Sequence, residues 1–436
     1  MAYLSLLGIV AAVAIFIFMS MKRFSVYMSA IAATIVLTVF SQMNPYSILN
    51  ESFMAGMSGF MRSYFILFLV SALFGRVMDE TGSARSIALT LARLTKRSKS
   101  GQKLLTVMIL CVFYTIMSYV GISGFVIAFT LLYIARDLFK EIDMPLWLYP
   151  YGSAGIFPAY ALGGSLSTVN IVATQGFGVT LTAGFGLSVI AFVVYYIVLI
   201  VLVQLDIRKA AKREEGFLPS GGPLLTLQNQ KAARPDEELP GFFKAFFPLL
   251  VPTIVITVFE LDAVLALVIA TVLCLLLNMK SIKSLPTTLT EGLGNGVLPI
   301  INVSCANGFA RVIQSTAGFA IIVALIEPLP GLLPSMIMMS GMTFCVGSMT
   351  AFLGSFMEIL HQWMLPLGIS PELCARLLCI AGFTFMMPHN AGVVNGVTLS
   401  KLDFRTGIWI YFKGTTIPGL CGLVVCVVLV TLGIVH

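Results

Sequence analysis

The chain has 436 residues, of which 58% are hydrophobic and only 10% are charged, and its mean hydropathy is +0.99. A soluble domain carries roughly 25% charged residues, so this composition excludes a soluble globular protein and indicates an all-α polytopic membrane protein. The formal net charge of +7 does not indicate nucleic-acid binding, because the basic residues gather in short loops, as the positive-inside rule describes.

The first half is expected to contain seven apolar spans. The first, Leu4 to Met19, has no preceding basic region and no convincing cleavage site, so we expect a retained helix rather than a signal peptide. Lys22 and Arg23 follow it and predict a cytoplasmic loop, which places the N-terminus outside. Further spans are expected near 24–41, 57–78, 104–119, 122–136, 146–162 and 183–204.

Residues 1–205 and 242–436 are expected to be two repeats joined by a cytoplasmic linker, 206–241. The second half starts from the cytoplasm, and its loops "FELDA" and "NMKSIKS" predict the opposite polarity to the first half. "FGRVMDETG" and "FARVIQSTAG" place Arg76 and Arg311 after comparable spans. We therefore predict two inverted repeats with about 12 to 14 transmembrane segments, and with the two arginines near opposite surfaces.

Four breaks rich in glycine and small polar residues interrupt the apolar segments. Such breaks are tolerated in a membrane where they are buried or line a cavity, and half-helix N-termini there attract anions. The candidates for substrate binding are Gly121 and Ser123 in the first break, Gly164, Ser165, Ser167, Thr168 and Asn170 in the second, Gly347, Ser348 and Thr350 in the third, and His389, Asn390, Asn395 and Thr398 in the fourth.

Two alternatives stay open for these breaks. The regions 104–136 and 336–355 are either pairs of full spans joined by a turn or re-entrant hairpins that reach the middle of the membrane. The hydroxyl and amide side chains either bind a small polar anion or form ordinary contacts between helices.

Candidates for ion coupling are few. Histidine side chains change charge near physiological pH, and His389 lies in the fourth break. A lone buried histidine is nevertheless often only a hydrogen-bonding residue. Glu358 and His361 share one helical face and form either a proton relay or a solvated pair. The eight cysteines lie in or near apolar segments without metal-ligand spacing, so we expect neither a metal site nor a cofactor.

Several segments resemble the gluconate permease (GntP) family of proton symporters, within the ion transporter superfamily. They are "FMAGMSGFMRSYFILFLVSALFGRVMDETGSARSIA", "ALGGSLSTVNIVATQGFG", "VGSMTAF" and "PHNAGVVNG". Gly164, Ser165, Asn170, His389 and Gly392 are the matching positions. The resemblance implies a carboxylate substrate, symport, a location in the bacterial inner membrane, and a transport domain that moves against a scaffold like an elevator.

We therefore expect a secondary active transporter that imports a small organic carboxylate, such as a hydroxy acid or sugar acid, with protons. A Na⁺-coupled or Na⁺/H⁺-exchanging carrier is the alternative, because broken helices with free carbonyls can also hold Na⁺. The sequence has no Walker motif and no nucleophile–base or metal constellation, which argues against ATP-driven transport and against an enzyme. The oligomeric state is left open, with a homodimer as one option.

Overall fold

The computed structural model describes residues 2–22, 24–83, 86–87, 90, 101–119, 121, 124–225, 239–259, 261–282, 284–346, 349–384, 393, 396–397 and 400–435. Over these ranges the chain forms helices and no strand. In the first half the helices are α1 (Ala2–Met21), α2 (Val26–Phe40), α3 (Pro45–Ile48), the π-helical turn η1 (Leu49–Phe53), α4 (Met54–Glu80), α6 (Gln102–Tyr119), α7 (Gly124–Glu141), the 3₁₀ helix η2 (Leu146–Ile156), α8 (Phe157–Ala161), α9 (Thr168–Gly176), α10 (Phe185–Lys212) and α11 (Leu218–Leu225). In the second half they are α12 (Phe242–Phe259), α13 (Ala263–Asn278), η5 (Met279–Ser281), α14 (Leu285–Gln314), α15 (Ala317–Ile326), α16 (Leu333–Val346), α17 (Met349–Met364), η6 (Leu365–Leu367), α18 (Pro371–Gly382) and α20 (Phe404–Thr431).

The long helices have apolar surfaces, which identifies their solvent as lipid. Six of the described helices are long and apolar enough to cross a membrane. On α10, the side chains of Phe185, Val193, Ile197 and Val201 are 53%, 48%, 58% and 53% exposed. Fully burying such a side chain is worth roughly 1.5–3 kcal/mol relative to water, so a lipid environment is strongly favoured. The predicted all-α membrane protein is confirmed.

One expected span is broken in the structure. Residues 146–162 form η2 and then α8 instead of a single helix. Pro150 lies inside η2 and Pro158 in the first turn of α8, and proline has no N–H to donate to a helical carbonyl. A Cβ at Gly155 would lie only 2.0 Å from the carbonyl oxygen of Cys111. The glycine therefore lets η2 pack directly against the backbone of α6.

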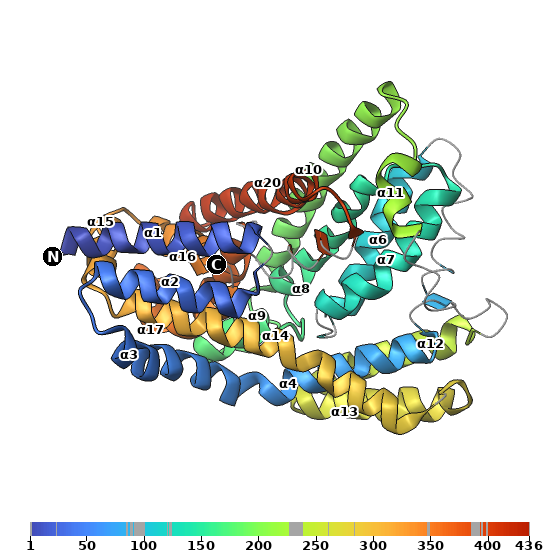
Figure 1. Ribbon diagram of the computed structural model, residues 1–436, viewed down its shortest axis with the longest axis horizontal. Coiled ribbons are helices and arrows are strands. Elements are labelled where there is room, and N and C mark those ends of the chain that lie inside the picture. The colour runs from blue at the N-terminus through green and yellow to red at the C-terminus, as the bar shows by residue number, and fades with distance from the viewer. Residues whose placement is uncertain are drawn as a thin grey trace.

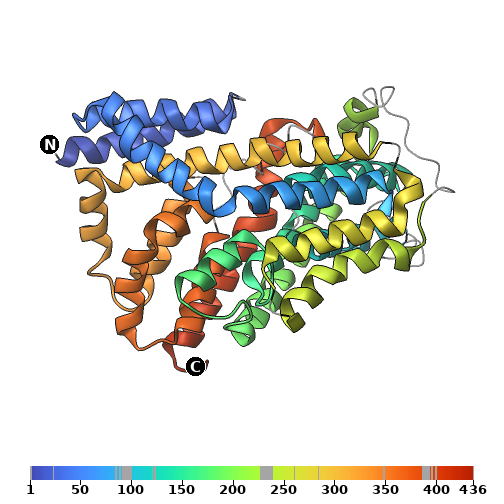
Figure 2. The same cartoon turned by 90° about the horizontal axis from the view of Figure 1, so that it is seen from below.

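Helices α4 and α14 lie antiparallel and pack through reciprocal glycines (Figure 2). A Cβ at Gly56 would lie 2.8 Å from the Cβ of Arg311, and a Cβ at Gly292 would lie 3.2 Å from the Cβ of Arg76. The start of each helix therefore meets the end of the other. Arg76 also pairs with Glu291 across this contact, at 2.7 Å. An inverted repeat would produce such reciprocal contacts, and the repeat itself stays a prediction.

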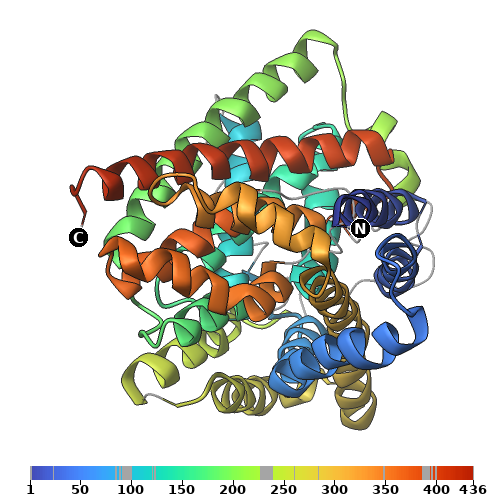
Figure 3. The same cartoon turned by 90° about the vertical axis from the view of Figure 1, so that its left-hand side faces the viewer.

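Two helical hairpins lie toward opposite ends of the long axis of the molecule. Figures 1 and 2 show α16 and α17 toward one end, and α6 and α7 toward the other. Viewed along that axis, α10 and α20 lie on one side and α12 and α13 on the opposite side (Figure 3). α6 is itself long and apolar enough to cross a membrane, so both alternatives for these two regions stay open.

Residues 206–225 of the expected linker, 206–241, fold against the rest of the chain. Its first residues continue α10. Beyond the helix, Trp147 Nε1 donates to Glu215 Oε2 at 2.8 Å. The backbone N–H of Phe217 donates to Asp143 Oδ1 at 2.8 Å, and the Phe217 side chain is only 1% exposed. This part of the linker is therefore docked on the segment that follows α7.

Candidate functional site

The chain is unwound between α8 and α9, at the second predicted break. Gly164 has a φ of +88°, a left-handed conformation that strongly favours glycine. Its N–H donates to the carbonyl of Leu181 at 2.7 Å. A Cβ at Gly164 would lie 2.7 Å from Tyr119 Oη. The break therefore requires glycine both for its backbone conformation and for this close contact.

The first predicted break packs directly against the second. Tyr119 Oη donates to the carbonyl of Gly163 at 2.6 Å, and the Leu166 N–H donates to the carbonyl of Tyr119 at 2.8 Å. Gly121 has a φ of +86°, and a Cβ there would lie 3.0 Å from the carbonyl oxygen of Leu166. The end of α6 and the segment between α8 and α9 thus form one structural unit.

The polar side chains of the second break are buried and bonded within the protein. Ser165, Ser167 and Asn170 are 0%, 7% and 0% exposed. Ser167 Oγ donates to the carbonyl of Ala159 at 2.5 Å and accepts from the Asn170 N–H at 3.3 Å, which makes Ser167 the N-cap of α9. Asn170 Nδ2 donates to the carbonyls of Ser165, at 2.8 Å, and Leu181, at 3.2 Å. These residues therefore shape the break.

Arg376 of α18 brings a buried positive charge to this break, since its side chain is 0% exposed. Nε and Nη2 donate to the carbonyl of Ala183 at 3.0 and 2.7 Å, and Nη2 also donates to the carbonyl of Leu181 at 3.3 Å. Nη1 donates to the carbonyl of Ala161 at 3.1 Å and to Asn170 Oδ1 at 2.8 Å. All five N–H groups of the guanidinium are thus used, and every acceptor is uncharged.

Arg376 is a functional candidate that the sequence patterns did not reveal, although a signal was present. The segment "PELCARLLCIAG" places an arginine inside an apolar helix, and an ionisable residue within a membrane is a functional-site hypothesis by default. Its partner could not be foreseen, because Asn170 lies 206 residues away in the chain.

Three candidates lie on α17, and they have different environments. Thr350 is 9% exposed, whereas Glu358 is exposed. The partly buried His361 ring lies edge-on to Phe177, with the ring centres 4.4 Å apart. Its Nε2 atom has no hydrogen-bond partner among the residues that the structure describes. Phe177 is the C-cap of α9, so His361 meets the opposite end of this helix from the break.

Thr168 begins α9 at the break, with a half-buried side chain. The other candidates lie outside the described residues: Ser123, Gly347, Ser348, His389, Asn390, Asn395 and Thr398. The convergence of the first-half and second-half breaks on one cavity therefore stays a prediction.

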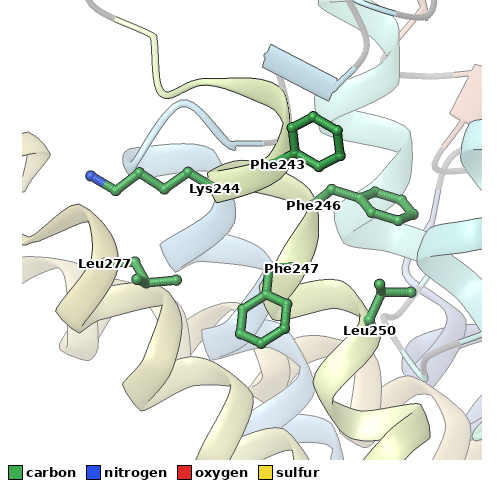
Figure 4. Close-up of a pocket in the computed structure, with 6 residues that line it drawn as sticks. All are labelled: Phe243, Lys244, Phe246, Phe247, Leu250 and Leu277. Atoms are coloured by element: carbon green, nitrogen blue, oxygen red, sulfur yellow. The ribbon is translucent and has the colours of Figure 1, made fainter.

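A separate pocket of about 330 Å³ lies at the surface of α12 and α13 (Figure 4). It is lined by Phe243, Lys244, Phe246, Phe247, Leu250 and Leu277. Figure 4 shows the Lys244 ammonium directed away from the phenylalanine rings, and Phe243 is 86% exposed. An apolar pocket open to the surface does not provide the hydrogen bonds that a small polar substrate needs, so the break is the better candidate site.

A polytopic chain that unwinds in its interior around a buried cation is typical of membrane transporters, in which broken helices form the substrate site. A family model described as "GntP family permease" matches residues 4–265, and the chain belongs to this family. The resemblance seen in the sequence is thereby confirmed.

Two individual proteins are similar over most of the chain. The uncharacterized transporter YxjC of Bacillus subtilis (strain 168) is 25% identical over 451 residues, which cover 92% of this chain and 94% of that protein. The crystal structure of the YdaH transporter of Alcanivorax borkumensis aligns with a TM-score of 0.48 and 15% identity, over 89% of each chain.

Proposed function

We propose that this GntP-family permease imports a small organic carboxylate, such as a hydroxy acid or a sugar acid, together with protons across the bacterial inner membrane. The observation that carries the proposal is the charge of Arg376. Its five N–H groups donate only to uncharged oxygens, so hydrogen bonding leaves its positive charge without a counter-charge. A buried positive potential favours an anionic substrate.

The attraction between Arg376 and an anionic substrate is large enough to favour anions over uncharged molecules. Two opposite unit charges about 8 Å apart attract one another by about 2 kcal/mol at an effective dielectric constant of about 20, which is roughly a 30-fold difference in affinity. The N-terminus of α9, which begins at Thr168, adds about 0.3–1 kcal/mol for an anion near its first turn. Because the guanidinium donors are all used, Arg376 acts on the substrate through its field rather than by direct hydrogen bonds.

Direct contacts are assigned to groups beside the break. The Thr168 hydroxyl is a suitable donor, and Ser123, His389, Asn390 and Asn395 are the other candidates that the sequence supplies. We also assign Ser165, Ser167 and Asn170 to the site. Their hydrogen bonds within the protein support a role in shaping the break.

The proposed mechanism is elevator-like. The elements that move as one body are η2, α6, α8, α9, α10, α18 and α20, which pack against one another. Two sets of contacts support this grouping. Tyr119 of α6 bonds to the break, and Arg376 of α18 bonds to the residues on both sides of it. The long helices α4 and α14 instead contact each other through Gly56 and Gly292, as a scaffold would.

The test is a thermal-shift screen of the purified protein with lactate, glycerate, gluconate and succinate. Glycerol serves as the uncharged counterpart of glycerate. We expect at least one carboxylate to raise the Tm, and glycerol to have no effect. Uptake of that acid into proteoliposomes should then respond to an inward proton gradient in sodium-free buffer. A requirement for sodium would instead favour the Na⁺-coupled alternative.

The role of Arg376 is tested by comparing Arg376→Gln with Arg376→Lys and with the control Arg311→Gln. Arg311 is exposed on α14 and bonds Gln314, so its loss should leave carboxylate binding unchanged. Arg376→Gln should weaken binding at least tenfold, and Arg376→Lys should retain part of it because the charge remains. A folded Arg376→Gln protein with wild-type affinity would contradict the proposed anion site.

A further inference from the structure

Asp206 of α10 is a buried carboxylate that the break does not use. It is 5% exposed, and no other buried carboxylate occurs among the side chains that the structure describes. Tyr151 Oη of η2 donates to Asp206 Oδ2 at 2.6 Å, and Lys413 Nζ of α20 donates to the same oxygen at 2.5 Å. Three elements that are distant in the sequence therefore meet at one ionisable group.

The ion pair of Asp206 and Lys413 is more deeply buried at the carboxylate than at the ammonium group. The side chain of Asp206 is 7% exposed, and that of Lys413 is 16% exposed. Ion pairs of this kind lose much of their hydration, and replacing them by apolar residues is often neutral or stabilising. Intramembrane acids frequently belong to proton relays. The burial of this pair therefore calls for a functional explanation.

Two of the titratable groups around Asp206 bond directly to its carboxylate. α10 packs against α20, η2, α6, α18 and α8. Tyr151 and Lys413 are the titratable groups on these elements that bond to the carboxylate. Among the other titratable groups on these elements, Cys111 donates to Tyr151 O, Tyr149 to Ala128 O, Tyr195 to Gly414 O and Cys426 to Leu187 O. Arg376 is bonded in the break, and Arg208, Lys209, Lys212 and Arg405 are exposed.

We propose that Asp206 carries the coupling proton of the transport cycle, with Lys413 and Tyr151 as positioning residues. The ionised carboxylate accepts hydrogen bonds from both partners. When a proton binds to the carboxylate, the ion pair is replaced by a neutral acid and a remaining lysine ammonium. Proton binding therefore adds one positive charge to the cluster.

The side on which the proton is released follows from the orientation of α10. α10 ends in Lys209, Lys212 and Arg213, and the positive-inside rule places that end in the cytoplasm. Asp206 lies within two turns of this end, so the proton is released there.

Asp206 is better suited to this role than the acid and the histidine of α17. Glu358 is exposed, and His361 lies beside the aromatic ring of Phe177. Neither is held by an opposite charge among the ion pairs that the structure gives for the described residues.

The inference rests on the proposed carboxylate transport, and it is tested with the full-length protein in proteoliposomes. The probe is the carboxylate that raises the Tm of the wild type most. Two reactions are compared: uphill uptake driven by an inward proton gradient, and exchange of labelled external for unlabelled internal substrate. Exchange needs no net proton movement. A pH-sensitive dye inside the vesicles reports the protons that enter with the substrate.

Asp206→Asn keeps an acceptor oxygen for Tyr151 and Lys413 but cannot carry the proton. We expect exchange to remain within about threefold of the wild type, gradient-driven uptake to fall at least tenfold, and the dye signal to disappear. The double variant Asp206→Asn/Lys413→Gln removes both charges and should behave in the same way, which keeps the test available if the single variant does not fold. Tyr151→Phe keeps the ion pair and should retain coupled uptake, with its pH profile displaced toward higher pH because the ionised carboxylate loses a donor.

Proton-coupled uptake by Asp206→Asn with the wild-type dye signal would overturn the proposal. Loss of exchange together with uptake in a folded variant would also overturn it, because the residue would then serve translocation or binding. Sodium-driven carboxylate uptake by the wild type without proton entry would overturn this inference and leave carboxylate transport standing. Failure of the wild type to bind or exchange any carboxylate would overturn the proposed function, and this inference with it.

Discussion

Arg376 and Asn170 are joined by a hydrogen bond of 2.8 Å between Nη1 and Oδ1, across 206 residues of chain. The amide oxygen of Asn170 accepts from the cation, and its amide nitrogen donates to the carbonyls of Ser165 and Leu181. One asparagine therefore links the cation of the second half to the unwound backbone of the first. Changes at position 170 should affect both the shape of the break and the charge within it.

Asn170→Ala should weaken carboxylate binding about tenfold or more, because a hydrogen bond to a charged group contributes roughly 1.5–3 kcal/mol and Arg376 loses one acceptor. Asn170→Asp should weaken binding further, although it keeps an acceptor for Arg376, because its carboxylate neutralises the guanidinium. Calorimetric titration with the carboxylate found in the screen measures both effects. Equal affinities for the two variants would show that the charge of Arg376 does not reach the substrate.

Gly164→Ala should destabilise the protein, because alanine in the left-handed region costs about 1–2 kcal/mol and its Cβ would lie 2.7 Å from Tyr119 Oη. Gly186→Ala on α10 is the matched control, since a Cβ there meets nothing within 4 Å and alanine favours a helix. The Tm of each variant in detergent provides the measurement. Tyr119→Phe should partly rescue Gly164→Ala, because it removes the clashing oxygen but not the backbone strain.

Arg76 and Arg311 are predicted to lie near opposite membrane surfaces, because α4 and α14 are antiparallel and each arginine lies near the end of its helix. Single cysteines introduced at the two positions should react with a membrane-impermeant thiol reagent from opposite sides of oriented vesicles. The background should be low, because most of the native thiols in the described part of the chain are buried. Labelling of both positions from the same side would refute the inverted repeat.

The linker is predicted to contribute nothing to substrate affinity, and shortening the chain between about Glu215 and Lys231 tests this. The structure sharpens the design, because Glu215 and Phe217 are bonded to Trp147 and Asp143. A deletion confined to 226–231 should therefore leave both the Tm and the Kd unchanged. A deletion that includes Phe217 should lower the Tm with little change in Kd. A large change in Kd for the shorter deletion, in a protein that still inserts, would count against the prediction.

The membrane class and two of the breaks could be predicted because they depend on local sequence. Hydropathy is a property of a short window, and helical hydrogen bonds satisfy the backbone within that window. The breaks at Gly121 and Gly164 were predicted from glycines beside hydroxyl residues, and both glycines have positive φ. Only glycine adopts that conformation without strain, so the residue type reveals the geometry.

The roles of Arg376 and Asp206 could not be predicted from local sequence, because they depend on partners that are distant in the chain. A lysine 207 residues away completes the site of Asp206, and no periodicity in either helix indicates that meeting. Position 206 was instead assigned to the start of a polar linker, because charged residues follow it directly. Helical continuation to Lys212 turns the aspartate inward, toward η2 and α20.

The hydrogen bonds of Arg376 also determine the order in which parts of the chain can fold during synthesis. The carbonyls of Ala161 and Ala183 accept hydrogen bonds from Arg376, which is synthesised long after they have left the ribosome. Until α18 inserts, these acceptors must be satisfied by water or by the insertion machinery, since lipid offers no donors. The first half therefore cannot settle into its final packing by itself. Chains arrested before residue 371 should keep the break open to protease, and synthesis through α18 should close it.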